Sequence, residues 1–296
     1  WETDLGWDIE GTQLSRGPNL IGFDHFGFPG LMVSHFHVRQ AMHNEFRLPK
    51  GVVLFLITRE PMPVVWNGRE LPPTMLAVVR SGRPHWAVVP AGWDCYEFIA
   101  SEALIRRTEI FPPSFFDKTT RAEDAVLPLA QPVTRVFLRG MDRHFRRVRA
   151  SRGRSSAVTS GAEFYEFILA GLQRIIDAGL AADGWPAPRP TRRADLVLEG
   201  RRFMETHLAR NLTADEIAQA LGVSYRVLNY AFRDAFGVGP YRYFLTERLH
   251  ASRRALRSGQ ASVTEVCLNH GFGHPSRFAR HYRRLFGELP SETRIA

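Results

Sequence analysis

Residues 213–240 read TADEIAQALGVSYRVLNYAFRDAFGVGP, and residues 262–290 read SVTEVCLNHGFGHPSRFARHYRRLFGELP. The second stretch repeats the first at an offset of 49 residues up to the glycine in its middle and of 50 residues after it. One residue has therefore been inserted in the turn of the second copy. An internal repeat is the strongest structural signal in this chain, and it predicts two copies of one supersecondary unit.

Each copy carries the signals of a helix, a tight turn and a second helix. In the first copy, Thr213 and Glu216 form a capping-box pattern, Gly222 interrupts the helix, and Ser224 can cap the next one. The second copy has serine, glutamate and glycine at the corresponding positions. Its second helix is expected to begin with Pro275, where the missing N–H costs nothing. The pattern predicts two helix-turn-helix units.

The second helix of each unit is predicted to have an apolar inner face and a polar outer face. A polar outer face on one helix is usually only solvated. Two such helices in tandem favour contact with DNA, because arginine and asparagine side chains can bond the edges of bases. The candidate DNA-contacting residues are Arg226, Asn229, Tyr230 and Arg233 in the first unit, and Ser276, Arg277 and Arg280 in the second.

Positive charge is concentrated in the same part of the chain. The 296 residues carry a formal net charge of +9, almost all of the basic residues are arginine, and residues 192–296 alone hold 17 Arg against 10 acidic residues. Arginine use can follow from a GC-rich genome. The uneven distribution nevertheless favours a polyanionic partner for the C-terminal third.

Residues 193–291 resemble the DNA-binding domain of the AraC family of bacterial transcription regulators. The residues that carry the resemblance are Leu212, Thr213, Ile217, Ala218, Leu221, Gly222, Val223, Ser224, Leu228, Phe232, Phe236, Gly237, Pro240, Tyr243, Arg248, Leu249, Ala251, Leu256, Val263, Gly271, Phe272, Phe278, Arg280, Phe286, Gly287 and Pro290. The resemblance implies that the third and sixth helices of the domain contact DNA. A connecting helix over 240–257 is expected to hold them about 34 Å apart, one turn of DNA. His274 and Pro275 depart from the family pattern at the start of the sixth helix.

The fold class predicted for the whole chain is α+β. The proline-rich run at 183–192 is predicted to be a linker between residues 1–182 and an all-α domain at 193–296. Short apolar runs and an Asn67-Gly68 turn predict many strands over 20–105. Helices are expected at 134–149 and 162–180, with a loop at 150–160. The resemblance implies that the strands form a cupin-like β-barrel that binds an effector, and that the helices dimerise.

Candidate effector-binding residues are the polar and aromatic side chains of the strand region: His35, His37, Arg39, Arg80 and Trp86. His35 and His37 would share one face of a strand, as a metal pair does. The carboxylate and third histidine of a cupin metal site are not at the expected places, so no metal and no cofactor are predicted.

Two features of the predicted helices leave alternatives open. The run 135–154 holds eight arginines and one acidic residue, Asp142. It is interpreted as a solvated face, with a contact to the DNA backbone or a dimer interface as alternatives. The apolar stripe of the helix at 162–180 is more typical of core, yet it is the best candidate for a dimer interface.

These observations favour a sequence-specific transcription regulator, with an activator more frequent in the family than a repressor. Its expected partners are promoter DNA, RNA polymerase, a small-molecule effector and a second copy of the chain. A cytoplasmic location is expected, because no signal peptide or membrane span is visible and only two cysteines occur. One alternative is a metal-dependent cupin-type enzyme, but the sequence lacks a complete set of metal ligands. A second is a regulator that needs no ligand. A third is a protein that coats DNA, which would be basic along the whole chain.

Overall fold

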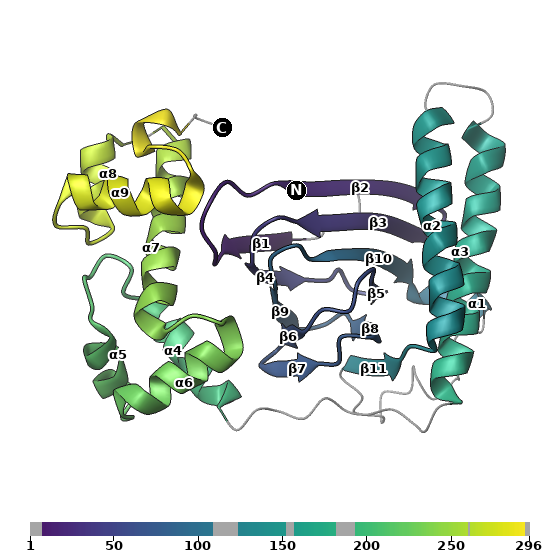
Figure 1. Ribbon diagram of the computed structural model, residues 1–296, viewed down its shortest axis with the longest axis horizontal. Coiled ribbons are helices and arrows are strands. Elements are labelled where there is room, and N and C mark those ends of the chain that lie inside the picture. The colour runs from purple at the N-terminus through teal and green to yellow at the C-terminus, as the bar shows by residue number, and fades with distance from the viewer. Residues whose placement is uncertain (1–7, 109–123, 152–156, 182–192, 260, 294–296) are drawn as a thin grey trace.

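A computed structural model describes residues 8–108, 124–151, 157–181, 193–259 and 261–293. Along its longest axis lie a pair of helices, two antiparallel sheets and a set of C-terminal helices (Figure 1). The predicted α+β class is thereby confirmed. The predicted linker, 183–192, lies outside the described residues.

The first sheet has six strands, and every neighbouring pair is antiparallel. In spatial order the strands are β11 (Asp124–Pro128), β8 (Met75–Arg80), β5 (Val52–Thr58), β10 (Asp94–Ser101), β3 (Leu31–Val38) and β2 (Ile21–Phe28). A short helix, α1 (Glu102–Thr108), follows β10.

The second sheet has five strands and lies face to face with the first. Its strands are β1 (Asp8–Gln13), β4 (Met42–Arg47), β9 (Pro84–Val89), β6 (Val64–Trp66) and β7 (Arg69–Leu71). Asn67 and Gly68 form the predicted turn between β6 and β7, with φ of 47° and 77°. The strands β1 and β11 lie outside the predicted range 20–105. The sequence of β1 is mostly polar, and β11 is only five residues long and ends in a proline, so neither carries a strong strand pattern.

Alternation along β4 decides what each face of the five-stranded sheet contacts. Met42 and Phe46 point between the sheets into an apolar core. His43 and Glu45 point to the other face, toward the C-terminal helices. Because both faces of this sheet are covered, it is an internal layer of the molecule.

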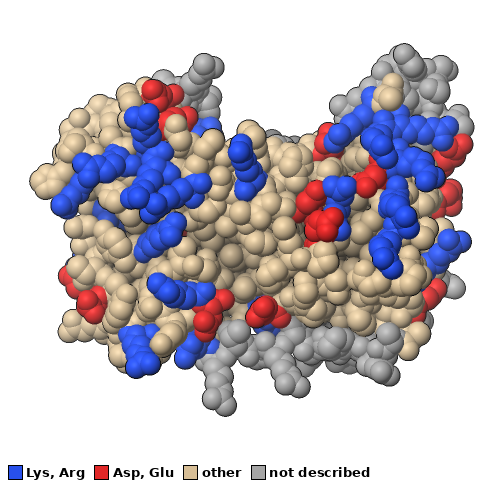
Figure 2. Space-filling model, in the orientation of Figure 1, with Lys and Arg blue, Asp and Glu red and all other residues tan. Residues whose placement is uncertain are grey.

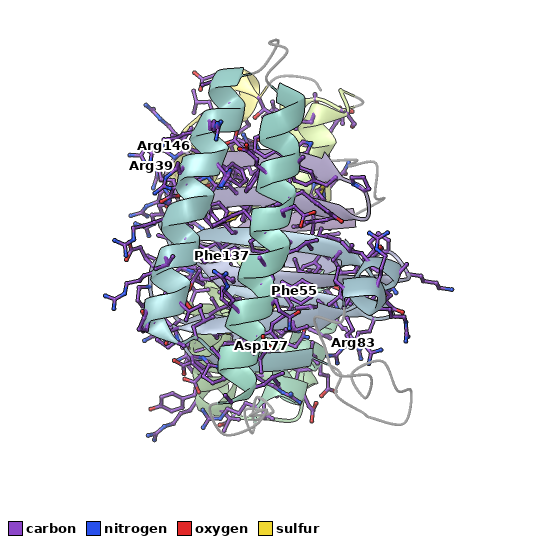
Figure 3. All side chains as sticks on the ribbon, turned by 90° about the vertical axis from the view of Figure 1, so that its right-hand side faces the viewer. Arg39, Phe55, Arg83, Phe137, Arg146 and Asp177 are labelled. Atoms are coloured by element: carbon purple, nitrogen blue, oxygen red, sulfur yellow. The ribbon has the colours of Figure 1, made fainter. Side chains whose placement is uncertain are left out.

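Helices α2 (Gln131–Ser151) and α3 (Ala157–Leu180) cross the outer face of the six-stranded sheet (Figure 3). Phe137 of α2 and Phe55 of β5 belong to the core between them. Both helices extend into the region 150–160, so the loop expected there is wrong over its first two and last four residues. Small residues such as Ala150 are compatible with a helix when its neighbouring turns are held by packing.

The C-terminal helices follow the predicted order. They are α4 (Ala194–Glu205), α5 (Ala214–Ala220), α6 (Tyr225–Phe236), α7 (Pro240–Arg257), α8 (Val263–Asn269) and α9 (Pro275–Phe286), with a 3-10 turn at Pro290–Glu292. Both capping boxes form as predicted, at Thr213 and at Ser262. In the connecting helix α7, the buried tyrosine is Tyr243, whereas Tyr241 is 44% exposed.

The five-stranded sheet packs directly on the first helix-turn-helix unit. Trp86 of β9 lies 5.6 Å from Phe236 of α6 between ring centroids, and both belong to the core of that unit. His43 is enclosed by Trp86, Phe236 and Tyr243, and the Tyr243 hydroxyl lies 3.2 Å from its Nδ1. The sheet and the C-terminal helices therefore share a continuous apolar core. None of the described helices is long and apolar enough to cross a membrane.

Candidate nucleic-acid interface

Helix α6 is held at both ends by local signals. The Ser224 side chain accepts a hydrogen bond from the Val227 backbone N–H, and Gly237 ends the helix in the left-handed conformation with φ of 68°. Leu228 and Phe232 are fully buried beneath it. The outer face of α6 is consequently fixed relative to the core.

The structure places three of the four candidates on α6 at the surface. Arg226, Tyr230 and Arg233 are exposed, and the Arg226 guanidinium lies 5.6 Å from the centre of the Tyr230 ring. Asn229 is half-buried, with its amide oxygen next to Gly239 at the start of α7. Asn229 is thus the candidate least available to a base.

Helix α9 presents the second set of candidates. It begins at Pro275, and its N-cap residue, His274, makes no side-chain capping bond. Ser276, Arg277 and Arg280 are all exposed. No acidic residue lies in the first turn, so the start of the helix remains open to an anion such as phosphate.

The outer face of α9 is strongly electropositive. The pKa of His281 is lowered by burial and by the charges of Arg284, Arg280 and Arg277. Burial is the largest of these causes, and the three exposed arginines add a positive local field to it. This field favours an anionic partner.

Arg248 of α7 connects the two units from inside. Its side chain is 1% exposed, its Nε donates to the His270 carbonyl at 2.8 Å, and one terminal nitrogen donates to Asn211 at 3.2 Å. Its guanidinium also lies 4.2 Å from the centre of the Phe272 ring. Because a buried guanidinium tolerates little displacement, it helps to fix one unit relative to the other.

Arginine and lysine side chains gather over the C-terminal helices and over α2 on the same face of the molecule (Figure 2). On α2, exposed arginines at 135, 139, 143 and 146 lie along one side, and none of them forms an ion pair within the described residues. Arg146 lies at the outer edge of the helix pair (Figure 3). Arg152 and Arg154 of the same run lie outside the described residues.

The five candidate effector-binding residues do not form one site, although His35 and His37 share one face of β3 as predicted, with their ring centroids 5.4 Å apart. His35 lies on the side of β3 that faces α2, where its Nε2 is 2.8 Å from Asp94 and its ring is 5.9 Å from that of Phe145. His37 and Arg39 are exposed, Arg80 ends β8, and Trp86 is buried against the C-terminal helices.

His35 instead belongs to an ion network that attaches α2 to the sheet. Arg59 bridges Asp94 at 2.6 Å and Asp142 at 2.9 Å, and the Tyr96 hydroxyl donates to Asp142. Within the described parts of the chain, no group of three or more His, Cys, Asp or Glu side chains is placed to hold a metal ion.

A buried carboxyl group in the sheet region was not predicted from the sequence. Glu97 of β10 is 9% exposed and lies between the two sheets, where burial raises the pKa of its carboxyl to about 7. The available signal was a single acidic residue within the otherwise apolar run Tyr96–Ile99. With no partner strand known, that signal did not distinguish an inward from an outward side chain.

Comparison with known proteins shows which kind of domain the C-terminal helices form. Residues 217–296 match the family model described as a helix-turn-helix domain. The XylDLEGF operon transcriptional activator of Pseudomonas putida is 38% identical over 95 residues, which are 31% of this chain and 30% of that protein. The transcriptional activator RhaS of Escherichia coli is 33% identical over 92 residues, 31% of this chain and 33% of that protein. The C-terminal helices form an AraC-type helix-turn-helix domain.

A solved structure is similar to a third of this chain. A transcriptional regulator from Chromobacterium violaceum, with an AraC-type DNA-binding domain, is 33% identical, covering 33% of this chain and 87% of that chain with a TM-score of 0.32. The chain spans about a third of the length of the curated relatives named here. Both relatives are named as transcriptional activators, and their similarity to this chain extends over 95 and 92 residues.

Proposed function

We propose that the chain is a transcription regulator that binds promoter DNA through its AraC-type domain. The observation that carries the proposal is the pair of matched helices α6 and α9. Each ends at a glycine in the left-handed conformation, each packs on a core, and each has exposed arginines on its outer face. Arg226, Arg277 and Arg280 are proposed to contact bases or to position the helices on the backbone. Tyr230, Arg233 and Ser276 lie beside them, and Asn229 requires a change of rotamer to join them.

The sheets and the helices α2 and α3 are proposed to form an effector-sensing part, as the family resemblance implies. We include in this proposal that a linker separates this part from the AraC-type domain, that its sheets are cupin-like, and that it binds an effector. A regulator of this kind acts where the chromosome is, in the cytoplasm, and an activator contacts RNA polymerase.

A second copy of the chain is also proposed as a partner. The apolar stripe of α3 does not supply the interface as it stands, because Phe164, Ile168, Leu172 and Ile176 are fully buried against α2 and the sheet. An interface built on α3 would use its outer residues, such as Glu163 and Asp177 (Figure 3). Sedimentation velocity of the full chain at micromolar concentration tests this: a monomer at every concentration removes the homodimer.

The DNA-binding proposal is tested with sites selected from random duplexes by the full-length chain. We expect specific binding at least 1000-fold tighter than binding to non-specific competitor at the same salt concentration. An enrichment that yields no shared sequence, with a specific-to-non-specific ratio near one, would instead indicate a DNA-coating protein.

A further inference from the structure

A cavity of about 500 Å³ lies where the two sheets meet helix α7. One wall is made by strands of both sheets, with Ile9, Phe36 and Asn44 among its residues. The opposite wall is the C-terminal half of α7, with Arg253 and Arg257. The cavity therefore touches both the sheet region and the AraC-type domain, and its size suits a small organic molecule.

The inner end of the cavity is defined by Glu97. Its carboxylate accepts a hydrogen bond from the Ser34 hydroxyl at 3.0 Å, and no arginine or lysine in the described part of the chain forms an ion pair with it. Its neighbours on the same face of β10, Cys95 and Ile99, belong to the apolar core. A carboxylate placed in apolar surroundings without a cation is unfavourable when ionised. A bound ammonium group would supply the missing charge.

The wall formed by α7 carries the opposite charge, although Glu10 of β1 also lines the cavity. Arg253, Arg254 and Arg257 of α7 line it, and Arg254 and Arg257 are exposed. Arg253 is held by Glu288 at 2.9 Å and by the Phe286 ring at 4.5 Å, but its Nε is buried and finds no hydrogen-bond acceptor among the described residues. A ligand carboxylate would provide an acceptor for a guanidinium already fixed in place.

The middle of the cavity is apolar. Phe23, Phe36, Met42 and Ile9 line it between the acidic and basic ends. The complementary molecule has a hydrocarbon body that separates its two charged groups.

We propose that this cavity binds a small amino carboxylate, with its ammonium group on Glu97 and its carboxylate on the arginines of α7. The inference rests on the proposed function, because it makes this molecule the effector of the regulator. Arg253 contacts Phe286 and Glu288, at the end of α9 and just beyond it. The same end of α9 is bonded to the sheet region, since the Gln13 side chain donates to the Leu285 carbonyl at 2.8 Å. A ligand here would cross-link the sensing sheets to the second DNA-contacting helix.

The test uses the full-length chain and matched probes in isothermal titration calorimetry. The probes are straight-chain ω-amino acids of four to ten carbons, each compared with the fatty acid and the alkylamine of equal length. We expect at least one ω-amino acid to bind ten-fold or more tightly than both of its matched compounds. Glu97→Gln should remove the advantage over the fatty acid. The double variant Arg253→Gln/Arg257→Ala should remove the advantage over the alkylamine.

Arg135→Ala, an exposed arginine on α2 far from this cavity, serves as the matched control and should leave binding unchanged. The proposal is overturned if no ω-amino acid binds, or if the best one binds equally well to wild type, Glu97→Gln and the double variant. DNA binding is measured separately on the same preparations. A chain that binds its selected DNA but no probe loses only this proposal, whereas one that binds the probe but no DNA loses the proposed function.

Discussion

Gly222 and Gly271 occupy equivalent turns of the two helix-turn-helix units, but their surroundings differ. Both have positive φ, 65° and 72°. A Cβ on Gly222 would meet nothing within 4 Å, whereas a Cβ on Gly271 would lie 2.7 Å from the Ala209 carbonyl oxygen. The first glycine is required by backbone conformation alone, and the second also by close approach of another segment.

This difference predicts unequal effects of the same substitution. Gly222→Ala should destabilise its unit by about 1–2 kcal/mol, the cost of a left-handed alanine. Gly271→Ala should cost about 2 kcal/mol more, because the clash is with backbone that cannot rotate away. Thermal unfolding of the two variants checks this, and equal shifts in the midpoint would contradict the contact at Gly271.

Buried histidines make the contact between the sheet and α7 sensitive to acid. His250 accepts a hydrogen bond from the Gln13 backbone N–H at 2.9 Å, and burial together with the charge of Arg254 lowers its pKa to about 3. His43 is fully buried, and burial followed by the charge of Arg201 lowers its pKa as well. Both rings are therefore neutral in the folded protein at pH values where the unfolded chain binds a proton.

The consequence is a loss of stability as pH falls below about 6.5, the ordinary pKa of histidine. Below that pH, each such histidine lowers the free energy of unfolding by about 1.4 kcal/mol for every pH unit. The reason is that the unfolded chain takes up the proton, whereas the folded protein does not until its own, lower pKa is reached. We expect His250→Gln to flatten the dependence of the unfolding midpoint on pH between 6.5 and 4.5. Parallel curves for wild type and variant would show that His250 takes up its proton as readily in the folded protein as in the unfolded chain, which would contradict this account.

At the scale of elements, the ends of the C-terminal helices were predictable from the sequence because their signals are local. The Thr213 and Ser262 capping boxes each lie within four residues, and Pro275 marks its helix start by itself. The burial of Trp86 and the inward direction of Glu97 were not predictable. Both depend on packing partners remote in the sequence, such as Phe236, which lies 150 residues after Trp86.

The arginines of α2 give a prediction that separates two interpretations of this helix. Arg135, Arg139 and Arg143 follow one another at i, i+4, so their mutual repulsion weakens the helix. Arg139→Glu should replace two repulsive pairs with two attractive ones and stabilise the chain by about 1 kcal/mol. A solvated face predicts unchanged affinity for the selected DNA. A several-fold loss of affinity together with a smaller dependence on salt would make this face a contact to the DNA backbone.

The whole molecule is a stack in which the AraC-type domain is docked on the sheets (Figure 1). The surface between the domain and the sheets contains a buried cation, since the Arg201 guanidinium is only 6% exposed. It forms ion pairs with Glu45 of the sheet and with Glu205 of its own helix. Glu45 is half-exposed, which limits the energy of its single interaction.

This arrangement predicts that the two carboxylates compensate for one another. Glu205→Ala alone should cost about 1 kcal/mol or less, since Glu45 still pairs with Arg201. The double variant Glu45→Ala/Glu205→Ala removes both carboxylates that pair directly with the buried guanidinium and should cost about 3 kcal/mol. Denaturation of both variants and of Glu45→Ala completes the cycle, and strictly additive losses would argue against a shared site on Arg201.

The central claim is that α6 and α9 each read one segment of the same duplex. Its most direct test is guanine methylation interference on a selected site, with the full-length wild type, Arg226→Ala and Arg280→Ala. The exposed Lys50, which lies outside α2, α6 and α9, supplies the control Lys50→Ala. We expect wild type and control to show two clusters of guanines at which methylation prevents binding, about one helical turn apart. Each α6 or α9 variant should lose one cluster, keep the other, and bind about 1–3 kcal/mol more weakly. A single cluster, or affinities and patterns unchanged in both variants, would contradict reading by these two helices.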